Sequence, residues 1–322
     1  LGLDTEPGAG DARALTGGRL LTALSASRPV IEFLQSPRRR GFVAAVIARA
    51  CLVRFETDTL VGLVLPEVDN GPLNVVVQAA PGAFATLQPG MRAEGLGDSL
   101  RIGTLGVCLS SAAPWEPSPD WQRLRAQSGR FLGYIRRLRP RAMRMASPDS
   151  LVLLLADSER LGGPMAARHS LAAARRAALA LRAASDTEDS AQIEAAAARL
   201  AGLGVGLTPA GDDFLVGAMI WAWLSHPNPE WFCQLLFKAA APKTTFLSSA
   251  FLRAASRGEC SAPWHDLLGA MEERNERRVA AAIRNVVSRG HTSGADALAG
   301  FIWMADRGDR PLAPGTLAAQ QS

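Results

Sequence analysis

The sequence predicts an α+β protein, in which a small antiparallel β barrel or sandwich precedes a mainly α-helical domain. Between Gly41 and Ser111, short apolar runs rich in valine are separated by turn residues roughly every 8–12 residues, which is typical of a small β barrel or sandwich. A stretch with three prolines, 114–119, follows. After it, apolar residues recur at helical spacing almost to the end of the chain.

The β-rich domain is assigned to residues 15–113, with roughly six strands. The segment from Phe42 to Val53 is nearly all apolar, and Thr59 to Leu65 is short and β-branched. Asn70-Gly71-Pro72 is a turn signal between two such runs. These features favour short strands joined by tight turns.

The helical domain is assigned to residues 118–310. Ser118 and Pro119 indicate the start of a helix, and its apolar stripe runs from Trp121 to Leu138. Ser185-Asp-Thr-Glu188 has the spacing of a capping box and predicts a helix up to about Leu200. The segment from Leu151 to Ala156 fits either a buried strand or a short helix. Further helices are expected over about 166–184, 211–225, 229–241, 245–257, 264–275, 277–288 and 293–306.

The composition narrows the class of protein. Of the 322 residues, 48% are hydrophobic and 20% are charged, which is typical of a soluble globular chain. The net charge of +5 comes almost wholly from arginine, and no aromatic residues interleave with a basic stripe, so nucleic-acid binding is not expected. No apolar run has the length of a membrane span, and the start of the chain lacks the apolar core of a signal peptide. The four cysteines have no metal or redox spacing. We therefore expect a cytoplasmic protein with no membrane contact.

One glycine-rich stretch, Gly202-Leu-Gly-Val-Gly-Leu-Thr-Pro-Ala-Gly-Asp-Asp-Phe-Leu-Val-Gly217, stands out as a candidate site. Thr208 and Pro209 are typical of an N-cap and first helical position, and the helix that follows is apolar on every face. Free backbone N–H groups at the start of a buried helix form a natural anion site. Asp212 and Asp213 in the first turn would cap the helix, bind a metal or hold a polar substrate. The alternative is a plain glycine loop with acidic residues favoured by the helix dipole.

A second stretch, Gly290-His-Thr-Ser-Gly-Ala-Asp-Ala-Leu-Ala-Gly300, repeats the pattern with one residue deleted. Thr292 matches Thr208, Asp296 matches Asp213, and Gly300 matches Gly217. The repeat predicts two helix starts that face one pocket, although two ordinary helix starts would give the same pattern. A lone histidine after such a glycine is usually a loop residue, but His291 lies beside Thr292 and Ser293, so a substrate or acid–base role is a second interpretation.

Two further polar segments interrupt the apolar background. Lys243-Thr-Thr-Phe-Leu-Ser248 lies at a predicted helix start, where hydroxyl groups bind an anion or simply cap the helix. Asp69-Asn-Gly-Pro-Leu-Asn74 lies in the β-rich domain and also fits a plain turn between strands.

The motif Gly-Leu-Gly-x-Gly-Leu-Thr-Pro-x-Gly-Asp-Asp-Phe-Leu-x-Gly resembles the signature of a bacterial family of formerly unknown function. That family includes the H subunit of the oxamate carbamoyltransferase of allantoin degradation, a route of purine catabolism. The segments around Asn70, Thr244 and His291 are also similar to its pattern. In this chain Val205 replaces a common proline and Ala210 a common serine, so one hydroxyl is missing. The resemblance implies a part in carbamoyl transfer between carbamoyl phosphate and oxamate, as one of three different subunits.

The leading hypothesis is therefore a subunit of an oxamate carbamoyltransferase-like enzyme that binds small anionic ligands at helix N-termini. The alternatives are a non-catalytic binding or assembly module for a small carboxylate or nucleotide, and a Mg²⁺-dependent enzyme that uses Asp212 and Asp213. Asp213 has a counterpart, Asp296, which favours a structural role. Asp212 has none, because Ala295 takes its place, which favours ligand contact. Catalytic candidates are Asp212, Asp213 and His291, and substrate-binding candidates are Gly204, Gly206, Thr208, Gly211, Thr244, Thr245, Ser248, Thr292, Ser293, Asp296, Asn70 and Asn74. No metal ligand set and no certain cofactor is predicted.

Overall fold

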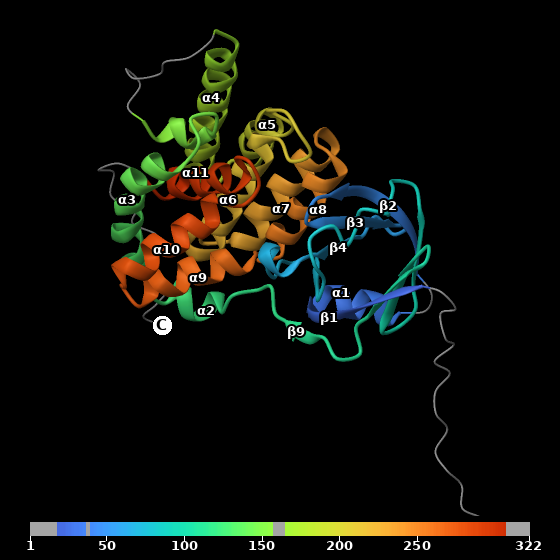
Figure 1. Cartoon of the computed structure of the whole chain (residues 1–322). Helices are drawn as coiled ribbons and strands as arrows, with labels where there is room; N and C mark the ends of the chain where they lie inside the picture. The colour runs from blue at the N-terminus through green and yellow to red at the C-terminus, as the bar shows by residue number, and fades with distance from the viewer. Residues whose placement is uncertain (1–17, 37–38, 157–164, 307–322) are drawn as a thin grey trace, which may run out of the picture.

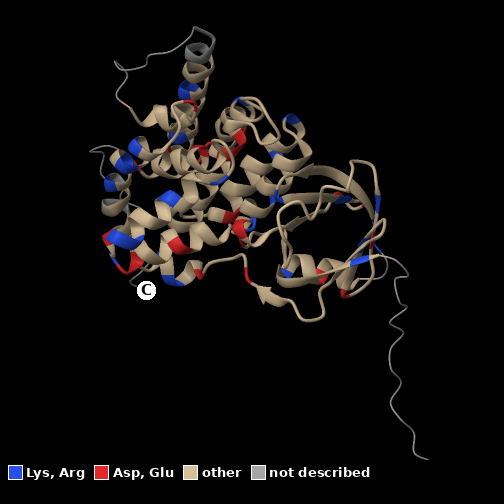
Figure 2. Cartoon of the chain, viewed as in Figure 1, with Lys and Arg blue, Asp and Glu red and all other residues tan. Residues whose placement is uncertain are grey.

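The computed structural model describes residues 18–36, 39–156 and 165–306. It confirms the α+β class: a β barrel formed by residues 19–115 is followed by a bundle of helices (Figure 1). Lysine and arginine residues are spread over many elements and form no continuous run along the ribbon in the view of Figure 2. None of the described helices combines the length and the apolar character that a membrane crossing needs.

Eight strands close the barrel, in the order β1-β5-β4-β3-β2-β6-β7-β8 and back to β1. The β4–β5 and β8–β1 pairs are parallel and the other six pairs of the ring are antiparallel, so the barrel is mixed and not antiparallel throughout. A ninth strand, β9, pairs in parallel with the end of β1. The strands are β1 (Arg19–Ser27), β2 (Arg39–Ile47), β3 (Ala50–Phe55), β4 (Leu60–Val64), β5 (Asn74–Val77), β6 (Arg92–Gly95), β7 (Ser99–Ile102), β8 (Leu105–Cys108) and β9 (Ala113–Trp115).

Side chains fill the barrel interior. Successive residues of a strand point to opposite faces, and the inward set is apolar, with Leu21, Val53 and Val107 among its buried members. Helix α1 (Arg28–Gln35) follows β1 and adds Val30 and Leu34 to the same core. The barrel therefore has an ordinary hydrophobic core.

The helical half contains the six late helices that the sequence predicts, with ends within about two residues of expectation except at the end of the helix after Ser261. The described α-helices of this half are α2 (Trp121–Arg125), α3 (Ser128–Met145), α4 (Met165–Thr187), α5 (Ser190–Leu200), α6 (Ala210–Ser225), α7 (Pro229–Ala240), α8 (Phe246–Ser256), α9 (Ala262–Glu272), α10 (Glu276–Val287) and α11 (Ser293–Ala305).

Three local predictions differ from the structure. The helix expected after Pro119 is two helices, α2 and α3, and Asp120 caps the first. The capping box at Ser185 is wrong, because α4 continues to Thr187 and Asp189 caps α5 instead by accepting from the Gln192 amide at 3.0 Å. The ambiguous segment near Leu151 is a short 3₁₀ helix, η2 (Leu151–Leu155).

The barrel meets the helices through a few specific contacts. The 3₁₀ turn η1 (Pro66–Val68) follows β4, and Arg289 at the end of α10 donates to its Glu67 carbonyl at 3.0 Å. The Arg54 guanidinium of β3 lies 4.0 Å from the centre of the Phe246 ring at the start of α8. The Ala262 amide at the start of α9 donates to the Asn70 carbonyl at 3.0 Å. The turn after β4 is thereby held against the helical half.

Candidate functional site

The two repeated motifs form one pair of packed helices, α6 and α11. A Cβ atom on Gly217 would lie 1.7 Å from the Ala297 carbonyl oxygen, and one on Gly300 would lie 2.0 Å from that of Phe214. Phe214 and Ala297 occupy equivalent places in the repeat, so the contact is reciprocal. Only glycine permits this approach of one helix backbone to the other.

A second pair of equivalent glycines presses each helix start onto the preceding helix. A Cβ atom on Gly211 would lie 2.0 Å from the Leu200 carbonyl oxygen of α5, and one on Gly294 would lie 1.8 Å from that of Val286 in α10. Both loops are therefore tight connections between neighbouring helices, and the two copies of the sequence repeat make equivalent backbone contacts.

The two helix starts lie side by side. The hydroxyl groups of Thr208 and Ser293 are hydrogen-bonded at 2.8 Å, which joins the first loop to the start of α11. The prediction that Thr208 is the N-cap is wrong, because Pro209 holds that position and α6 begins at Ala210. The Thr208 side chain thus points across the contact between the two loops, where Thr208 meets Ser293; this contact is called the seam below.

The backbone amides at these helix starts are largely used within the chain. The Gly211 amide donates to the Leu203 carbonyl at 2.8 Å, and the equivalent Gly294 amide donates to the Arg289 carbonyl at 3.0 Å. The Asp213 amide donates to the Pro209 carbonyl at 3.3 Å. The hydrogen-bond donors that remain at the seam are therefore mainly side chains, and the amide-lined anion site expected from the sequence is not formed by these groups.

Asp212 is held by the chain itself and is 1% exposed. Its Oδ1 accepts from the Gly202 amide at 2.9 Å, and its Oδ2 accepts from the Thr244 hydroxyl. Burial raises the pKa of this carboxyl, and the hydrogen bonds from Thr244 and Gly202 act in the opposite direction. Asp212 thus ties α6 to the glycine loop and to the segment before α8. These contacts favour a structural role, whereas the sequence favoured ligand contact for Asp212.

Asp213 has different surroundings. The residue keeps some exposure, but its Oδ2 atom is buried and has no hydrogen-bond partner among the described residues. Burial raises the pKa of Asp213 to about 8, and the negative charges of Asp296 and Asp212 add to this. The hydroxyl groups of Ser293 and Thr208 lower it. Burial of this carboxyl therefore favours its neutral form.

Asp296, the counterpart of Asp213, is fully buried in α11. Its Oδ1 accepts from the Leu151 amide at 2.6 Å and so ties η2 to α11. Burial raises the pKa of Asp296 to about 6, against the opposing effects of the Leu151 amide and the Thr292 hydroxyl. Its Oδ2 has no partner in the described part of the chain. Equivalent sequence positions thus have different partners.

The other predicted side chains at helix starts are mostly structural in this arrangement. The Thr245 hydroxyl accepts from the Ser248 amide at 3.0 Å as the N-cap of α8, and donates to the Leu207 carbonyl at 2.6 Å. Ser248 is buried beside Asp212. Gly204 and Gly206 have φ values of +117° and +103° in the exposed part of the loop, a conformation that favours glycine.

The turn containing Asn70 and Asn74 is adjacent to the second loop. The Asn70 carboxamide oxygen accepts from the Ser25 hydroxyl at 2.7 Å, and the Asn74 amide group donates to the Asp69 carbonyl at 3.0 Å. Arg289 joins this turn to the second loop, since its guanidinium lies 3.7 Å from the Asp69 carboxylate and Gly290 follows it directly. His291 is exposed in the same loop. The two asparagines support the turn that contacts Arg289 beside the second loop.

The structure therefore brings Thr208, Asp213 and Ser293 together, with Asp296 close enough to act on Asp213. Sequence reasoning missed the amides of Gly202 and Leu151 and the side chain of Arg289. Only Arg289 had a signal, its place directly before Gly290. Among the described residues no group of three or more His, Cys, Asp or Glu is placed to hold a metal ion. Both Asp212 oxygens accept hydrogen bonds from the chain, from the Gly202 amide and the Thr244 hydroxyl.

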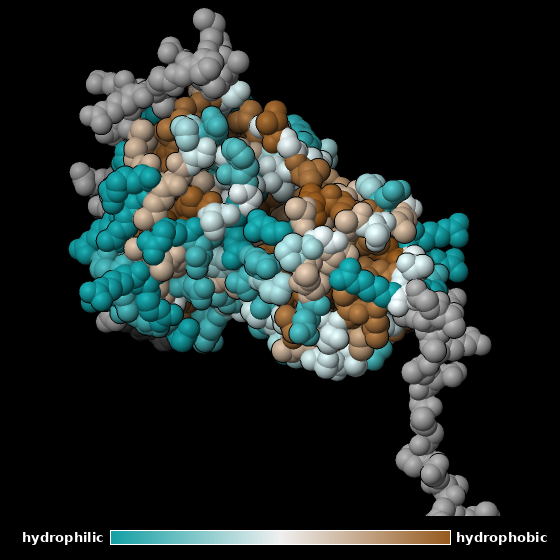
Figure 3. All heavy atoms as spheres, viewed as in Figure 1, coloured by the Kyte–Doolittle hydropathy of each residue, from teal (hydrophilic) through white to brown (hydrophobic). Residues whose placement is uncertain are grey.

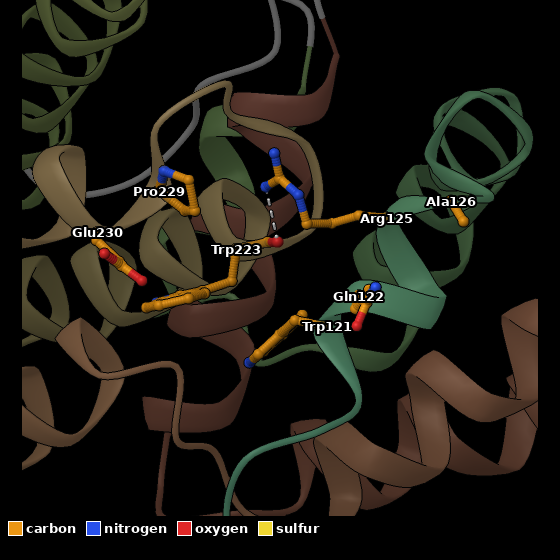
Figure 4. A pocket seen from close by; sticks show the side chains of 7 residues that line it. All are labelled: Trp121, Gln122, Arg125, Ala126, Trp223, Pro229 and Glu230. Carbon is orange, nitrogen blue, oxygen red and sulfur yellow. Dashed lines mark hydrogen bonds between the residues drawn. The ribbon is translucent and has the colours of Figure 1, made fainter. Parts of the chain in front are cut away.

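A separate surface hollow of about 520 Å³ lies between α2 and the end of α6 (Figure 4). Its walls include Trp121 and Trp223, whose indole N–H groups donate to the Gly258 and Ala255 carbonyls at 2.8 and 3.0 Å. Arg125 reaches into it and donates to the Trp223 carbonyl at 3.2 Å. The hollow shares no residue with the seam between the two loops.

The region around the seam is the part of the chain that matches a known family. Residues 200–305, about a third of the chain, match the family model described as oxamate carbamoyltransferase subunit AllH. The match runs from the last residue of α5 to the last residue of α11, so it includes both loops and both helices of the pair. No solved structure matches the chain. The resemblance seen in the Asp-Asp motif is confirmed.

Proposed function

We propose that this chain, a member of the AllH family of oxamate carbamoyltransferase subunits, binds a small anionic substrate at the seam between its two loops. The reaction would be carbamoyl transfer between carbamoyl phosphate and oxamate, carried out together with other subunits. The observation that supports the site is the hydrogen bond at 2.8 Å between Thr208 and Ser293, which joins the starts of two buried helices. Helix starts favour negative charge through the helix dipole.

Carbamoyl transfer suits a site of this kind. The protein must hold two anions in a reactive geometry and stabilise the negative charge that develops on the leaving phosphate. Hydroxyl groups fixed by packed helices supply donors with little reorganisation. The glycine contacts of Gly217 and Gly300 fix the two helices relative to each other, and so they fix Thr208 against Ser293.

The test is reconstitution of the enzyme with its partner subunits, with and without this chain. We expect carbamoyl transfer to require the chain, and Ser293→Ala to lower kcat/KM for oxamate about 10-fold, as loss of one hydrogen bond to a charged ligand predicts. Ser288→Ala is the matched control, because Ser288 is an exposed hydroxyl at the end of α10. Full activity without the chain, or equal kinetics for the two variants, contradicts the proposal.

An assembly role is the second candidate, and the exposed end of the glycine loop favours it. Val205 is 95% exposed and Leu207 is 51% exposed, so the loop presents apolar side chains to solvent. Figure 3 shows apolar side chains along the upper edge of the molecule, from α5 towards α8. If assembly is the main role, Val205→Ser will prevent complex formation in size-exclusion chromatography, and Ser293→Ala will leave kinetics unchanged.

A further inference from the structure

The surface hollow between α2 and the end of α6 has no part in the proposed function. Its volume of about 520 Å³ falls within the range of about 300–1,000 Å³ that is typical of small-ligand sites. Trp121 and Trp223 form an aromatic wall, and the polar side chains that reach the hollow include Arg125 and Glu230. A mainly apolar hollow with a few polar groups is typical of a site for a small molecule.

The aromatic wall is fixed in place by the segment at the end of α8. The indole rings of Trp121 and Trp223 are stacked with their centres 6.1 Å apart, and their N–H groups donate to the Gly258 and Ala255 carbonyls. A Cβ atom on Gly258 would lie 2.8 Å from the Trp121 Nε1 atom and 3.1 Å from the Trp223 ring, so this packing depends on glycine. Since the indole N–H groups are bound within the chain, the rings can offer a ligand only their apolar surface. Fixed aromatic surfaces of this kind bind flat rings by stacking.

Two side chains of opposite charge reach the hollow without neutralising each other. Arg125 donates to the Trp223 and His226 carbonyls at 3.2 and 2.8 Å, which uses only two of the five N–H groups of its guanidinium. Glu230 is exposed in the first turn of α7. In the described part of the chain neither side chain forms an ion pair, and Trp223 lies between them in the view of Figure 4. A ligand on the Trp223 ring would therefore meet a cation on one side and a carboxylate on the other.

We propose that this hollow binds an adenine nucleotide. The base stacks on the tryptophan wall, its exocyclic amino group donates to Glu230, and the phosphate accepts from Arg125. Each part answers one wall, because a carboxylate only accepts and a guanidinium only donates. A simple aromatic carboxylate has no donor for Glu230, and inorganic phosphate has no ring. The hollow shares no residue with the seam, so this inference is independent of the proposed function.

The experiment is calorimetric titration of the full-length chain with AMP at about pH 7.5, beside three probes that each lack one part. Adenosine lacks the phosphate, ribose phosphate lacks the base, and IMP has a carbonyl oxygen in place of the exocyclic amino group. We expect AMP to bind, and each probe to bind about 10-fold more weakly, as the loss of one charged hydrogen bond or one stacked base predicts. Excess oxamate should leave the affinity for AMP unchanged, because the two sites are separate.

Substitutions test each contact in turn. Glu230→Gln should bind AMP and IMP within about 3-fold of each other, because a carboxamide both donates and accepts. Its control, Glu194→Gln on the exposed face of α5, should keep the preference for AMP. Trp223→Leu should weaken AMP binding about 10-fold, whereas Trp223→Phe keeps a ring and should bind within about 3-fold of wild type. Arg125→Gln should weaken binding of AMP about 10-fold and leave that of adenosine unchanged, with thermal melts to show that each variant is folded.

Several results would overturn the proposal. These are absence of AMP binding by the wild type, equal binding of AMP and ribose phosphate, and a preference for AMP over IMP that survives Glu230→Gln. Competition between oxamate and AMP would place the nucleotide at the seam and would overturn the separate site. If oxamate fails to bind while AMP binds as expected, the proposed function is contradicted and this inference stands.

Discussion

Removal of the Asp212 side chain should destabilise the fold more than removal of any other carboxyl at the seam. In Asp212→Ala the Gly202 amide and the Thr244 hydroxyl both lose their acceptor. A hydrogen bond to a charged group contributes about 1.5–3 kcal/mol, so two of them give an expected loss of about 3–6 kcal/mol. At about 2 °C per kcal/mol, which suits a large chain, Tm should fall by about 6–12 °C.

Asp212→Asn tests the charge separately from the shape. Its carboxamide oxygen can still accept from the Gly202 amide, and its N–H group can donate to a rotated Thr244 hydroxyl. We expect a loss of about 1–2 kcal/mol. A double-mutant cycle with Thr244→Val should give a coupling energy of about 1–2 kcal/mol between the two positions. The measurements are thermal and urea denaturation by circular dichroism.

The opposite outcome is equally clear. If Asp212→Asn melts with the wild type and the coupling energy is zero, the hydrogen bond between Asp212 and Thr244 contributes nothing to stability. If oxamate binding falls about 10-fold at the same time, the sequence-based assignment of Asp212 as the ligand contact is right, and the role drawn from its contacts is wrong.

Other predictions concern packing, pH and the contact between barrel and helices. Gly217→Ala should unfold the chain or lower Tm by more than about 10 °C, because its Cβ would lie 1.7 Å from a carbonyl oxygen. The control is Gly269→Ala in α9, where the Cβ has open space. This variant should stabilise the chain by about 0.5–1 kcal/mol in thermal melts. The pKa of Asp213 is raised to about 8 from an ordinary 3.8, so its contribution to stability is complete below about pH 4 and is lost as pH rises through about 8. Urea denaturation should therefore show the free energy of unfolding falling between these two pH values. The fall should be less steep in Asp213→Asn. Arg289→Ala should make the η1 turn between barrel and helices more susceptible to limited proteolysis, because Arg289 donates to the Glu67 carbonyl of that turn. Arg284→Ala, on the exposed face of α10, is the control. Equal cleavage of both variants would contradict this.

Local sequence signals predicted the helical half well and the barrel less completely. The late helices are bounded by proline, glycine and capping residues, which act within a few positions of each helix end. Strands β5 to β9 have only three or four residues each, which is too short for an alternating pattern to mark a strand, and β6 (Arg92–Gly95) has only alanine and glycine besides its two charged residues. Closure of the barrel depends on the parallel pairing of β1 with β8, between segments about 85 residues apart in sequence, and no local pattern reports such a pairing.

At the candidate site, sequence predicted the scaffold but not the chemistry of each carboxyl. The adjacency of the two loops was predicted from the repeated Gly-x-Thr…Asp-x-Leu-x-Gly frame, in which equivalent glycines permit a close approach of the two helices. The roles of Asp212 and Asp213 depend on partners from other segments: Gly202 lies 10 residues from Asp212, and Thr244 lies 32 residues away. Hydrogen-bond partners at such separations become visible only when the chain is folded.

The asymmetry between the two copies explains why the chemistry of the seam centres on Asp213. Each copy uses one carboxyl to tie its own surroundings together: Asp212 holds the first loop and the segment before α8, and Asp296 holds η2. The first copy has one carboxyl more than the second, since Ala295 stands where Asp212 does. Asp213 is therefore released from that structural task and faces hydroxyl groups from both loops, Thr208 from its own and Ser293 from the other. A ligand at this position would contact both copies at once, so a substitution in either loop should change its affinity.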